Sequence, residues 1–223
     1  MTQLRESQSG PEAAPASRVG LSPLRVRRAA LADVDRLVEM NHAAYPDLVE
    51  ENVVYDASMI RSHLAVFPDG QLVATRDGRV VGSVSTLIVR GKHALARHTW
   101  TQITSDGRFT DHDPDGDTLY LADIYVAPEA WGTGVGPFLY DALKALCREL
   151  GLARVVAGGR MWGYSQFAGT AQQYVEAVQR GEVADRVLTS QLRAGFEVRG
   201  VLPGYLHDAR SRSFATLLEW TCA

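Results

Sequence analysis

A strand–helix–strand pattern over residues 118–159 constrains the fold more than any other part of the chain. The stretch "TLYLADIYVAP" predicts a long strand that ends at Pro128. In residues 135–150 apolar side chains recur at offsets 0, 3, 4, 7, 8, 11 and 15, which places them on one face of a helix. "ARVVAGG" predicts the next strand, and two strands joined by a helix run parallel. The pattern therefore predicts a mixed α/β domain.

Weaker patterns predict the remaining elements. Residues 71–89 contain two β-rich runs around Asp77-Gly78, a pair that favours a tight hairpin turn. Further helices are predicted over residues 31–45, 56–67, 171–181 and 186–195, and further strands over 24–29, 196–202 and 213–220. In the first of these helices, one face is predicted to carry Leu31, Val34, Leu37 and Val38 together. The polar segment 90–117 shows no clear period, and no element is predicted there.

The composition is that of an ordinary globular chain of 223 residues, 46% apolar and 22% charged. A formal net charge of −3 gives no bulk attraction to nucleic acid or to an anionic membrane, so neither partner is expected. No apolar run approaches the about 20 residues of a membrane-spanning helix, and the polar start lacks the apolar core of a signal peptide. Two separate cysteines predict no disulfide framework, so we expect a cytoplasmic protein. A flexible tail is predicted over residues 1–19 and a single domain over 20–223.

Three glycines, Gly132, Gly134 and Gly136, connect the long strand to the helix. Backbone N–H groups at a helix start lack partners within the helix and carry partial positive charge, so such a junction binds anions. The segment lacks the Gly-Lys-Ser/Thr of a phosphate-binding NTPase loop, and its G-x-G-x-G spacing differs from the G-x-G-x-x-G of dinucleotide-binding folds. A tight turn that binds no ligand remains the alternative.

The stretch "DIYVAPEAWGTGVGPFLYDAL" resembles the acyl-CoA-binding signature of the GNAT N-acetyltransferases, in which a strand and V-x-P precede Gln/Arg-x-x-Gly-x-Gly/Ala and a helix. "VRRAALAD", the hairpin and "RAGFEV" are also similar to that family. The resemblance implies an α/β (α+β) fold of the GNAT type, with a mixed, mostly antiparallel sheet, splayed central parallel strands and helices on both faces. It also implies an acyltransferase that uses acetyl-CoA.

The same resemblance implies which residues bind the cofactor. In this family the loop amides bind the pyrophosphate of CoA, and the backbone of the splayed strand binds the pantetheine. These contacts are carried over onto Ile124, Tyr125 and Val126 of the strand, and onto Trp131, Gly132, Thr133, Gly134, Val135, Gly136 and Pro137 of the loop. Trp131 departs from the family, which has Gln or Arg there. Either a side-chain contact to the pyrophosphate is lost, or the indole covers the cofactor instead.

Acetyl transfer to an amine needs a base for the ammonium proton and an acid for the leaving thiolate. Asp123 is the candidate base because it interrupts an apolar strand, where a carboxylate is costly without a partner; a structural ion pair is the alternative. Gln191 occupies the position of the family's usual catalytic tyrosine. Tyr164 is therefore the candidate acid, with Tyr205 as a weaker choice and Tyr174 as a packing residue.

Arg160, at the end of the second strand, is the candidate to bind a substrate carboxylate through two hydrogen bonds, with a structural salt bridge as the alternative. The acidic run "DHDPDGD" over 111–117 imitates a calcium loop, but its twelfth position is Ala122 rather than a bidentate Glu. The six histidines are scattered without ligand spacing. We therefore expect no metal site.

A narrower resemblance concerns domain context. "VVAGGRMWGY" and "QLRAGFEVRGVLPGYL" are similar to GNAT domains that precede a nitrilase-like hydrolase domain in some bacterial proteins. No such domain follows here, so we expect the chain to act alone, as a homodimer or with a separate partner protein. The predicted function is acetyl-CoA-dependent transfer to a primary amine, and a small-molecule amine is favoured because residues 160–190 would crowd a protein acceptor. A non-catalytic acyl-CoA-binding module is the alternative.

Overall fold

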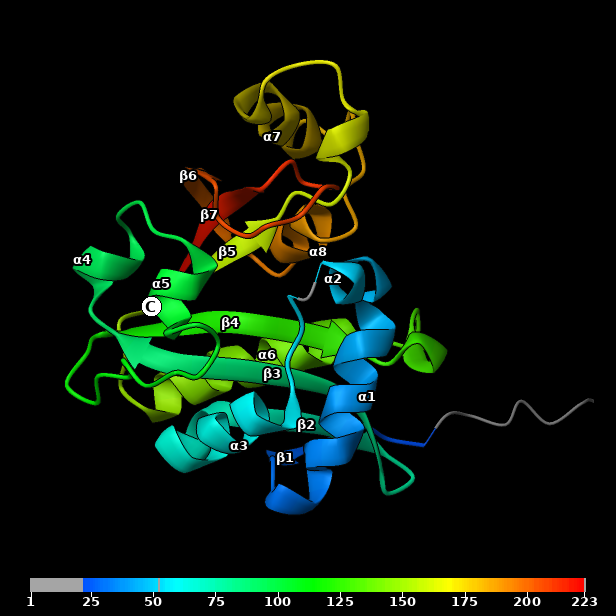
Figure 1. Ribbon diagram of the computed structural model, residues 1–223, viewed down its shortest axis with the longest axis vertical. Helices are drawn as coiled ribbons and strands as arrows, with labels where there is room; N and C mark the ends of the chain where they lie inside the picture. The colour runs from blue at the N-terminus through cyan, green and yellow to red at the C-terminus, as the bar shows by residue number, and fades with distance from the viewer. Residues whose placement is uncertain (1–21, 52, 223) are drawn as a thin grey trace, which may run out of the picture.

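The computed structural model describes residues 22–51 and 53–222, which form a seven-stranded sheet with helices on both faces (Figure 1). The strands lie in the order β1-β2-β3-β4-β5-β7-β6. β4 and β5 pair in parallel and the other neighbours antiparallel, which confirms the predicted mixed sheet. The strands are β1 Arg25–Arg28, β2 Gln71–Arg76, β3 Arg79–Val89, β4 Thr118–Val126, β5 Arg154–Arg160, β6 Glu197–Pro203 and β7 Phe214–Thr221. The predicted tail, residues 1–19, lies outside the described residues.

Helices α1 and α3 pack on one face of the sheet, and α6 packs on the other (Figure 1). The helices are α1 Val34–Ala44, α2 Pro46–Glu50, α3 Ala57–Val66, α4 Gly91–Ala94, α5 Trp100–Thr104, α6 Val135–Glu149, α7 Ala171–Gln179 and α8 Leu188–Arg193. None of the helices in the described part of the chain is long and apolar enough to cross a membrane.

Two predictions about the helices are wrong. Segment 90–117 contains the short helices α4 and α5, which span four and five residues and are too short to show a helical period. Leu31 is 69% exposed, because α1 begins only at Val34. The preceding turn is a tight 3-10 turn, in which Asp33 accepts both the Ala30 N–H and the Arg27 guanidinium.

The parallel pair separates partway along its length. β4 and β5 pair only as far as Leu121 and Ala157. Beyond that point β4 stays beside β3, and β5 stays beside β7. The register between β3 and β4 shifts at Ala122, where β4 carries one extra residue, and such a bulge bends a strand. The splay implied by the family resemblance is therefore present.

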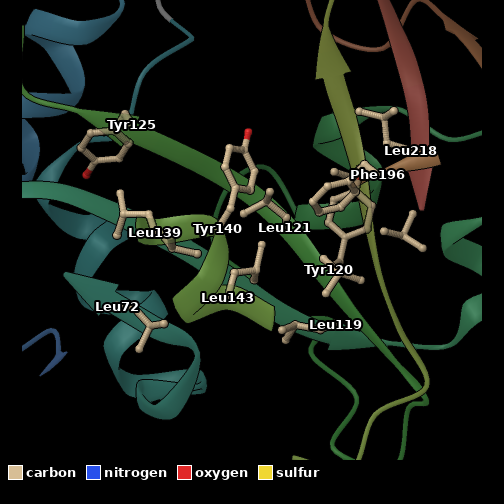
Figure 2. Close-up of a cluster of buried hydrophobic side chains, with 14 of the residues drawn as sticks. Leu72, Leu119, Tyr120, Leu121, Tyr125, Leu139, Tyr140, Leu143, Phe196 and Leu218 are labelled. Atoms are coloured by element: carbon tan, nitrogen blue, oxygen red, sulfur yellow. The ribbon is translucent and has the colours of Figure 1, made fainter. Parts of the chain in front are cut away.

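Helix α6 packs against the sheet through the apolar stripe predicted from the sequence. Leu139 and Leu143 are fully buried, and they lie in the same apolar cluster as Leu119 of β4 (Figure 2). A Cβ atom added to Gly82 of β3 would lie 2.8 Å from Val135 Cγ1 and 2.9 Å from Leu139 Cδ1. The first turns of the helix therefore pack directly on β3 at Gly82, which positions the glycine loop that precedes the helix.

This close approach predicts that Gly82→Ala lowers the free energy of unfolding by about 1–3 kcal/mol, because the added methyl group overpacks the contact. Urea denaturation measures the change. Gly200→Ala on β6 is the control, since a Cβ there meets nothing within 4 Å. Equal stability of the two variants would contradict the packing described here.

Candidate active site

A cavity of about 410 Å³ opens where β4 and β5 separate. Helices α1 and α2 line it on one side, and the glycine loop, α6 and α8 line it on the other. Asp123 of β4, Gly158 of β5 and residues of the loop between β6 and β7 complete the wall. The cavity therefore connects the two faces of the sheet through the gap between the strands.

The bulge at Ala122 decides which face Asp123 occupies. Side chains alternate along a regular strand, so Tyr120 and Asp123, three residues apart, would point to opposite faces. Because of the extra residue, Tyr120 and Asp123 point to the same face of the sheet. The Tyr120 hydroxyl contacts Tyr205, and the Asp123 carboxylate contacts Asn41 of α1. Both of these partners line the cavity.

The Asp123 carboxylate is held by two hydrogen bonds. Asn41 Nδ2 donates to Oδ2 at 2.9 Å, and the Tyr45 hydroxyl donates to Oδ1 at 2.7 Å. Burial raises the pKa of Asp123 to about 6, and the hydrogen bond from Tyr45 acts in the opposite direction. Among the described residues no arginine or lysine forms an ion pair with it. Asp123 is therefore ionised at neutral pH yet close to its pKa, as a general base requires.

Two consecutive glycines on β5 leave room for polar side chains on its two faces. A Cβ on Gly158 would lie 2.1 Å from Tyr205 Cζ, and one on Gly159 would lie 2.4 Å from Gln191 Oε1. Successive strand residues face opposite sides, so Tyr205 covers one face and Gln191 the other. Gln191 Oε1 is buried and has no hydrogen-bond partner among the described residues. Because Gln191 lines the cavity and such an atom is costly without a donor, it suits a ligand N–H.

A chain of three buried side chains ends at Tyr205 in the cavity. His98 Nδ1 lies 2.8 Å from the Ala96 carbonyl oxygen, which can only accept, so Nδ1 carries the proton. Burial lowers the pKa of His98, so the ring is neutral and Nε2 accepts from the Tyr120 hydroxyl at 2.8 Å. Tyr120 then accepts from the Tyr205 hydroxyl at 2.8 Å. The Tyr205 oxygen therefore presents lone pairs to the cavity.

The glycine loop presents an open helix start to the cavity. Gly132 and Gly134 have φ angles of +73° and +85°, which favour glycine. Gly136 lies in the first turn of α6, and a Cβ there would meet nothing within 4 Å. Gly136 borders the cavity, so its missing side chain leaves space for a ligand. Arg76 of β2 fixes the loop by donating to Thr133 Oγ1 at 2.9 Å and to the Thr133 carbonyl at 3.2 Å.

Side chains contact and cover the carbonyl oxygens of β4 that face the gap. Trp100 Nε1 donates to Ala122 at 3.2 Å, and Trp131 Nε1 donates to Val126 at 2.9 Å. The Tyr45 hydroxyl, which gives its one proton to Asp123, lies 3.0 Å from the Ile124 carbonyl oxygen and covers it. The Ala127 N–H donates to β3, so the N–H groups of Ile124 and Val126 point away from β3 into the gap. Beyond the bulge β4 thus offers donors, and a ligand there must supply acceptors such as amide carbonyls.

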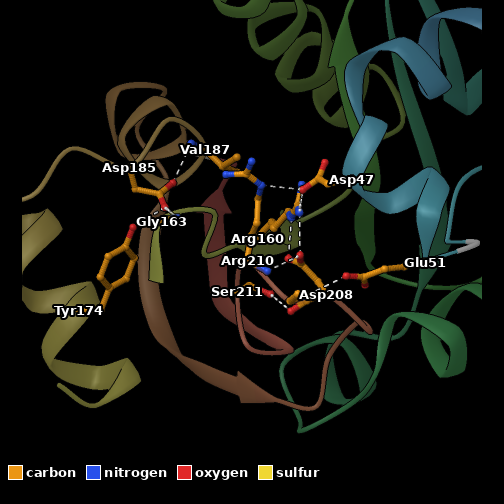
Figure 3. Close-up of polar contacts among 11 residues, drawn as sticks. Asp47, Glu51, Arg160, Gly163, Tyr174, Asp185, Val187, Asp208, Arg210 and Ser211 are labelled. Atoms are coloured by element: carbon orange, nitrogen blue, oxygen red, sulfur yellow. Dashed lines mark hydrogen bonds and ion pairs between the residues drawn. The ribbon is translucent and has the colours of Figure 1, made fainter. Parts of the chain in front are cut away.

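Arg160, which lines the cavity, lies in a network of ion pairs (Figure 3). Its Nε and Nη2 donate to the two oxygens of Asp208 at 2.6 and 2.7 Å, and Nη2 also contacts Asp47. Arg210 Nε pairs with Asp47 at 3.1 Å. Burial opposes ionisation of Asp208, but the Arg160 guanidinium holds the pKa of Asp208 below its usual value. The edge of Arg160 suited to a substrate carboxylate is therefore occupied by Asp208.

The structure does not bring Tyr164 to the cavity. Its hydroxyl donates to the Gly169 carbonyl at 3.3 Å, and the residue is not part of the cavity wall. Tyr174 donates to Asp185 at 2.6 Å, in a separate contact (Figure 3). Tyr205, the weaker choice from the sequence, lines the cavity instead.

The predicted cofactor residues divide into two groups. Ile124, Tyr125, Val126, Trp131 and Gly136 line the cavity, whereas Gly132, Thr133, Gly134, Val135 and Pro137 are absent from its wall. The sequence reasoning missed Asn41, Tyr45 and Arg186. Asn41 had a detectable signal, because it lies seven residues after Val34 on the apolar stripe of the predicted helix.

The acidic run 111–117 makes contacts of its own. Asp117 Oδ1 accepts the Gly91 N–H at 2.6 Å, and Asp113 pairs with Arg90 at 2.8 Å. Within residues 22–51 and 53–222 there is no group of three or more His, Cys, Asp or Glu that could hold a metal ion.

Comparison with known proteins identifies the family. Residues 34–162 match the model of the acetyltransferase (GNAT) family, and the chain belongs to this family of acyltransferases. YkwB of Bacillus subtilis, an uncharacterized N-acetyltransferase, is 34% identical over 199 residues, which cover 88% of each chain. YhcX of the same organism, a probable hydrolase, is 37% identical over 191 residues. That match covers 84% of this chain and 36% of YhcX.

Solved structures share the fold. The loading GNATL domain of CurA from Lyngbya majuscula has a TM-score of 0.78 at 20% identity, covering 90% of this chain and 98% of that one. The GNAT-like decarboxylase GphF, in complex with isobutyryl-CoA, has a TM-score of 0.76 at 22% identity, covering 88% and 98%. YncA of Salmonella typhimurium, solved with acetyl-CoA, has a TM-score of 0.53 at 19% identity, covering 89% and 93%.

The raised pKa of Asp123 predicts how stability depends on pH. The folded carboxyl, with a pKa of about 6, binds a proton at pH 5, whereas the unfolded one, near 3.8, does not. The contribution of Asp123 to the free energy of unfolding therefore falls as pH rises from about 4 to about 6. Asparagine does not titrate, so Asp123→Asn does not lose this contribution. The free energy of unfolding of the variant therefore rises relative to that of the wild type between pH 4 and pH 6. Urea denaturation of both proteins at pH 4 and pH 7 measures this difference in the free energy of unfolding. If the variant instead loses stability relative to the wild type as pH rises, the pKa of Asp123 is lowered rather than raised.

Proposed function

We propose that the chain transfers an acetyl group from acetyl-CoA to a primary amine of a small molecule, by direct transfer without a covalent enzyme intermediate. One observation carries the proposal: a single cavity connects the glycine loop at the start of α6 to the Asp123 carboxylate through the gap between β4 and β5. An acyl donor on one face of the sheet and an acceptor on the other meet in such a gap.

The residues present fit a CoA thioester. The N-terminus of α6 and the open space beside Gly136 suit a pyrophosphate. The N–H group of Val126 suits an amide carbonyl of a pantetheine arm, and the N–H group of Ile124, which also interacts with Asp123, faces the same gap. The unpartnered Gln191 Oε1 suits one of the pantetheine amide N–H groups. These are the contacts that the family resemblance implies, with Gln191 added.

The polar groups on the acceptor side suit an amine. Asp123 takes the ammonium proton, and the Tyr205 lone pairs accept a second N–H and orient the nitrogen. The free amine then attacks the acetyl carbonyl and the carbon–sulfur bond breaks. The nitrogen loses a second proton as it becomes an amide, and that proton neutralises the leaving thiolate. Gln191 cannot protonate the thiolate itself, because an amide does not ionise in this range.

The acceptor side of the cavity also determines how polar the rest of the amine molecule can be. Leu48, Val53, Val54, Trp100 and Leu206 give this part of the cavity an apolar wall. Arg160, the candidate for a substrate carboxylate, already pairs with Asp208 and Asp47. We therefore propose an amine with an apolar body, and assign Arg160 to joining α2 to the loop between β6 and β7.

The loop geometry predicts that Gly136→Asp abolishes acetyl-CoA binding without unfolding the protein. A carboxylate in the first turn of a helix stabilises it, yet here it would repel the pyrophosphate. Acetyl-CoA should raise the melting temperature of the wild type and of Gly136→Ala, but not of Gly136→Asp. An unchanged melting temperature of the wild type at millimolar acetyl-CoA would contradict the cofactor assignment.

The role of Asp123 predicts that Asp123→Asn lowers turnover by about 10²–10⁴, the usual effect of removing a general base. The affinity for acetyl-CoA should stay within about threefold, because the proposed cofactor contacts do not involve this carboxylate. Wild-type kcat/KM should fall as pH drops through about 6, where Asp123 becomes protonated, and the variant should lack this inflection. Thiol release with an amine library measures both. If acetyl-CoA binds but no amine releases thiol, a non-catalytic binding module replaces this proposal.

A second candidate is decarboxylation of a carboxyacyl-CoA such as malonyl-CoA. A GNAT-like decarboxylase shares the fold, with a TM-score of 0.76. Arg160 and Arg210 pair with Asp47 and Asp208, but Arg186 at the cavity wall has no carboxylate partner among the described residues and would attract a substrate carboxylate. Carbon dioxide release from malonyl-CoA without any amine would favour this candidate over acetyl transfer.

A further inference from the structure

Arg186, which precedes α8, lies over two indole rings. Its guanidinium carbon lies 4.8 Å from the centre of the Trp131 ring and 5.2 Å from that of Trp162. Arg210 stacks on Trp162 at 4.5 Å. All four side chains border the cavity, and Trp131 belongs to the glycine loop. The stack therefore joins the glycine loop to the opposite wall of the cavity.

The charge of Arg186 is not neutralised within the described part of the chain. Arg160 and Arg210 each pair with a carboxylate, but no carboxylate oxygen of residues 22–51 or 53–222 lies within 4.0 Å of Arg186. Stacking holds a guanidinium by its face, so the N–H groups along its edge remain available. A planar cation held in this way is suited to bind two phosphate oxygens at once.

We propose that Arg186, held by Trp131 and Trp162, binds the pyrophosphate of the acyl-CoA from the side opposite the N-terminus of α6. The residue before the first loop glycine is Trp131, which cannot contact a phosphate as Gln or Arg does. Its indole instead supports a guanidinium supplied from residue 186. The loss of one polar side chain is thereby compensated by another from a distant part of the sequence. This inference rests on the proposed cofactor.

The chain provides a matched control in Arg212. This arginine is also exposed, and its guanidinium carbon lies 4.8 Å from the Tyr164 ring centre. Neither Arg212 nor Tyr164 borders the cavity. Arg212→Gln therefore removes the same charge and the same kind of stacking away from the proposed site.

Calorimetry with three ligands tests the inference: acetyl-CoA, its 3′-dephospho form, and S-acetylpantetheine, which has no phosphate. Arg186→Gln should weaken binding of the first two by about tenfold, and binding of S-acetylpantetheine should not change. Arg186→Lys keeps the charge but loses the planar fork, so its affinity for the first two ligands should lie between that of Arg186→Gln and that of the wild type. Arg212→Gln should bind all three ligands like the wild type. Circular dichroism checks that each variant is folded.

Each other outcome overturns the inference in a distinguishable way. If the wild type does not bind acetyl-CoA, the proposed cofactor fails and the inference fails with it. If the wild type binds but Arg186→Gln binds equally well, the stack is only a packing feature. If Arg186→Gln weakens acetyl-CoA but not its dephospho form, the side chain binds the 3′-phosphate rather than the pyrophosphate.

Discussion

The separation of β4 from β5 beyond Leu121 and Ala157 is the constraint on which the rest of the site depends. A parallel pair that opens within a sheet releases backbone N–H and C=O groups that must find other partners. Here a bulge at Ala122 bends one strand away, and β5 carries Gly158 and Gly159 where it borders the opening. The same bulge turns Asp123 toward the cavity. The same bulge therefore both opens the sheet and places the Asp123 carboxylate.

The released carbonyl groups account for several side chains that look unrelated in the sequence. Trp100, Tyr45 and Trp131 come from three different segments, and each covers one β4 carbonyl in the gap, the two indoles by donating an N–H to it. Since side chains cover the carbonyl oxygens and the N–H groups point into the gap, this part of β4 presents mainly hydrogen-bond donors to a ligand. Tyr205 and Gln191 add acceptor atoms from the β5 side. This division of donors and acceptors gives the cavity its chemical preference for an amide-containing ligand and an amine.

Much of the fold was predictable because it depends on local patterns. The stripe of α6, the hairpin at Asp77-Gly78 and the glycine loop are each specified by residues close in sequence. The bulge was not predictable, because Ala122 has no side-chain signal and the register depends on β3. Helices α4 and α5 were missed because they are shorter than two turns.

Within the site, Asp123 could be singled out because a carboxylate interrupts an apolar strand. Its partners Asn41 and Tyr45 lie about 80 residues away in sequence, and tertiary contacts alone bring them together. Its place after β5 makes Tyr164 a candidate in the sequence, yet the chain turns there and directs its hydroxyl to Gly169. Loop geometry determines which of several tyrosines faces the cavity, and no periodic pattern in the sequence predicts loop geometry.

Mass spectrometry of the products from carbon-13-labelled acetyl-CoA and an amine library can establish whether the gap carries acetyl transfer to an amine. We expect one labelled acetyl-amine for each CoA thiol released, with amines of apolar body among the acceptors. Thiol release that yields labelled acetate and no acetylated amine would contradict this expectation, because the gap would then admit water rather than an amine to the acyl group.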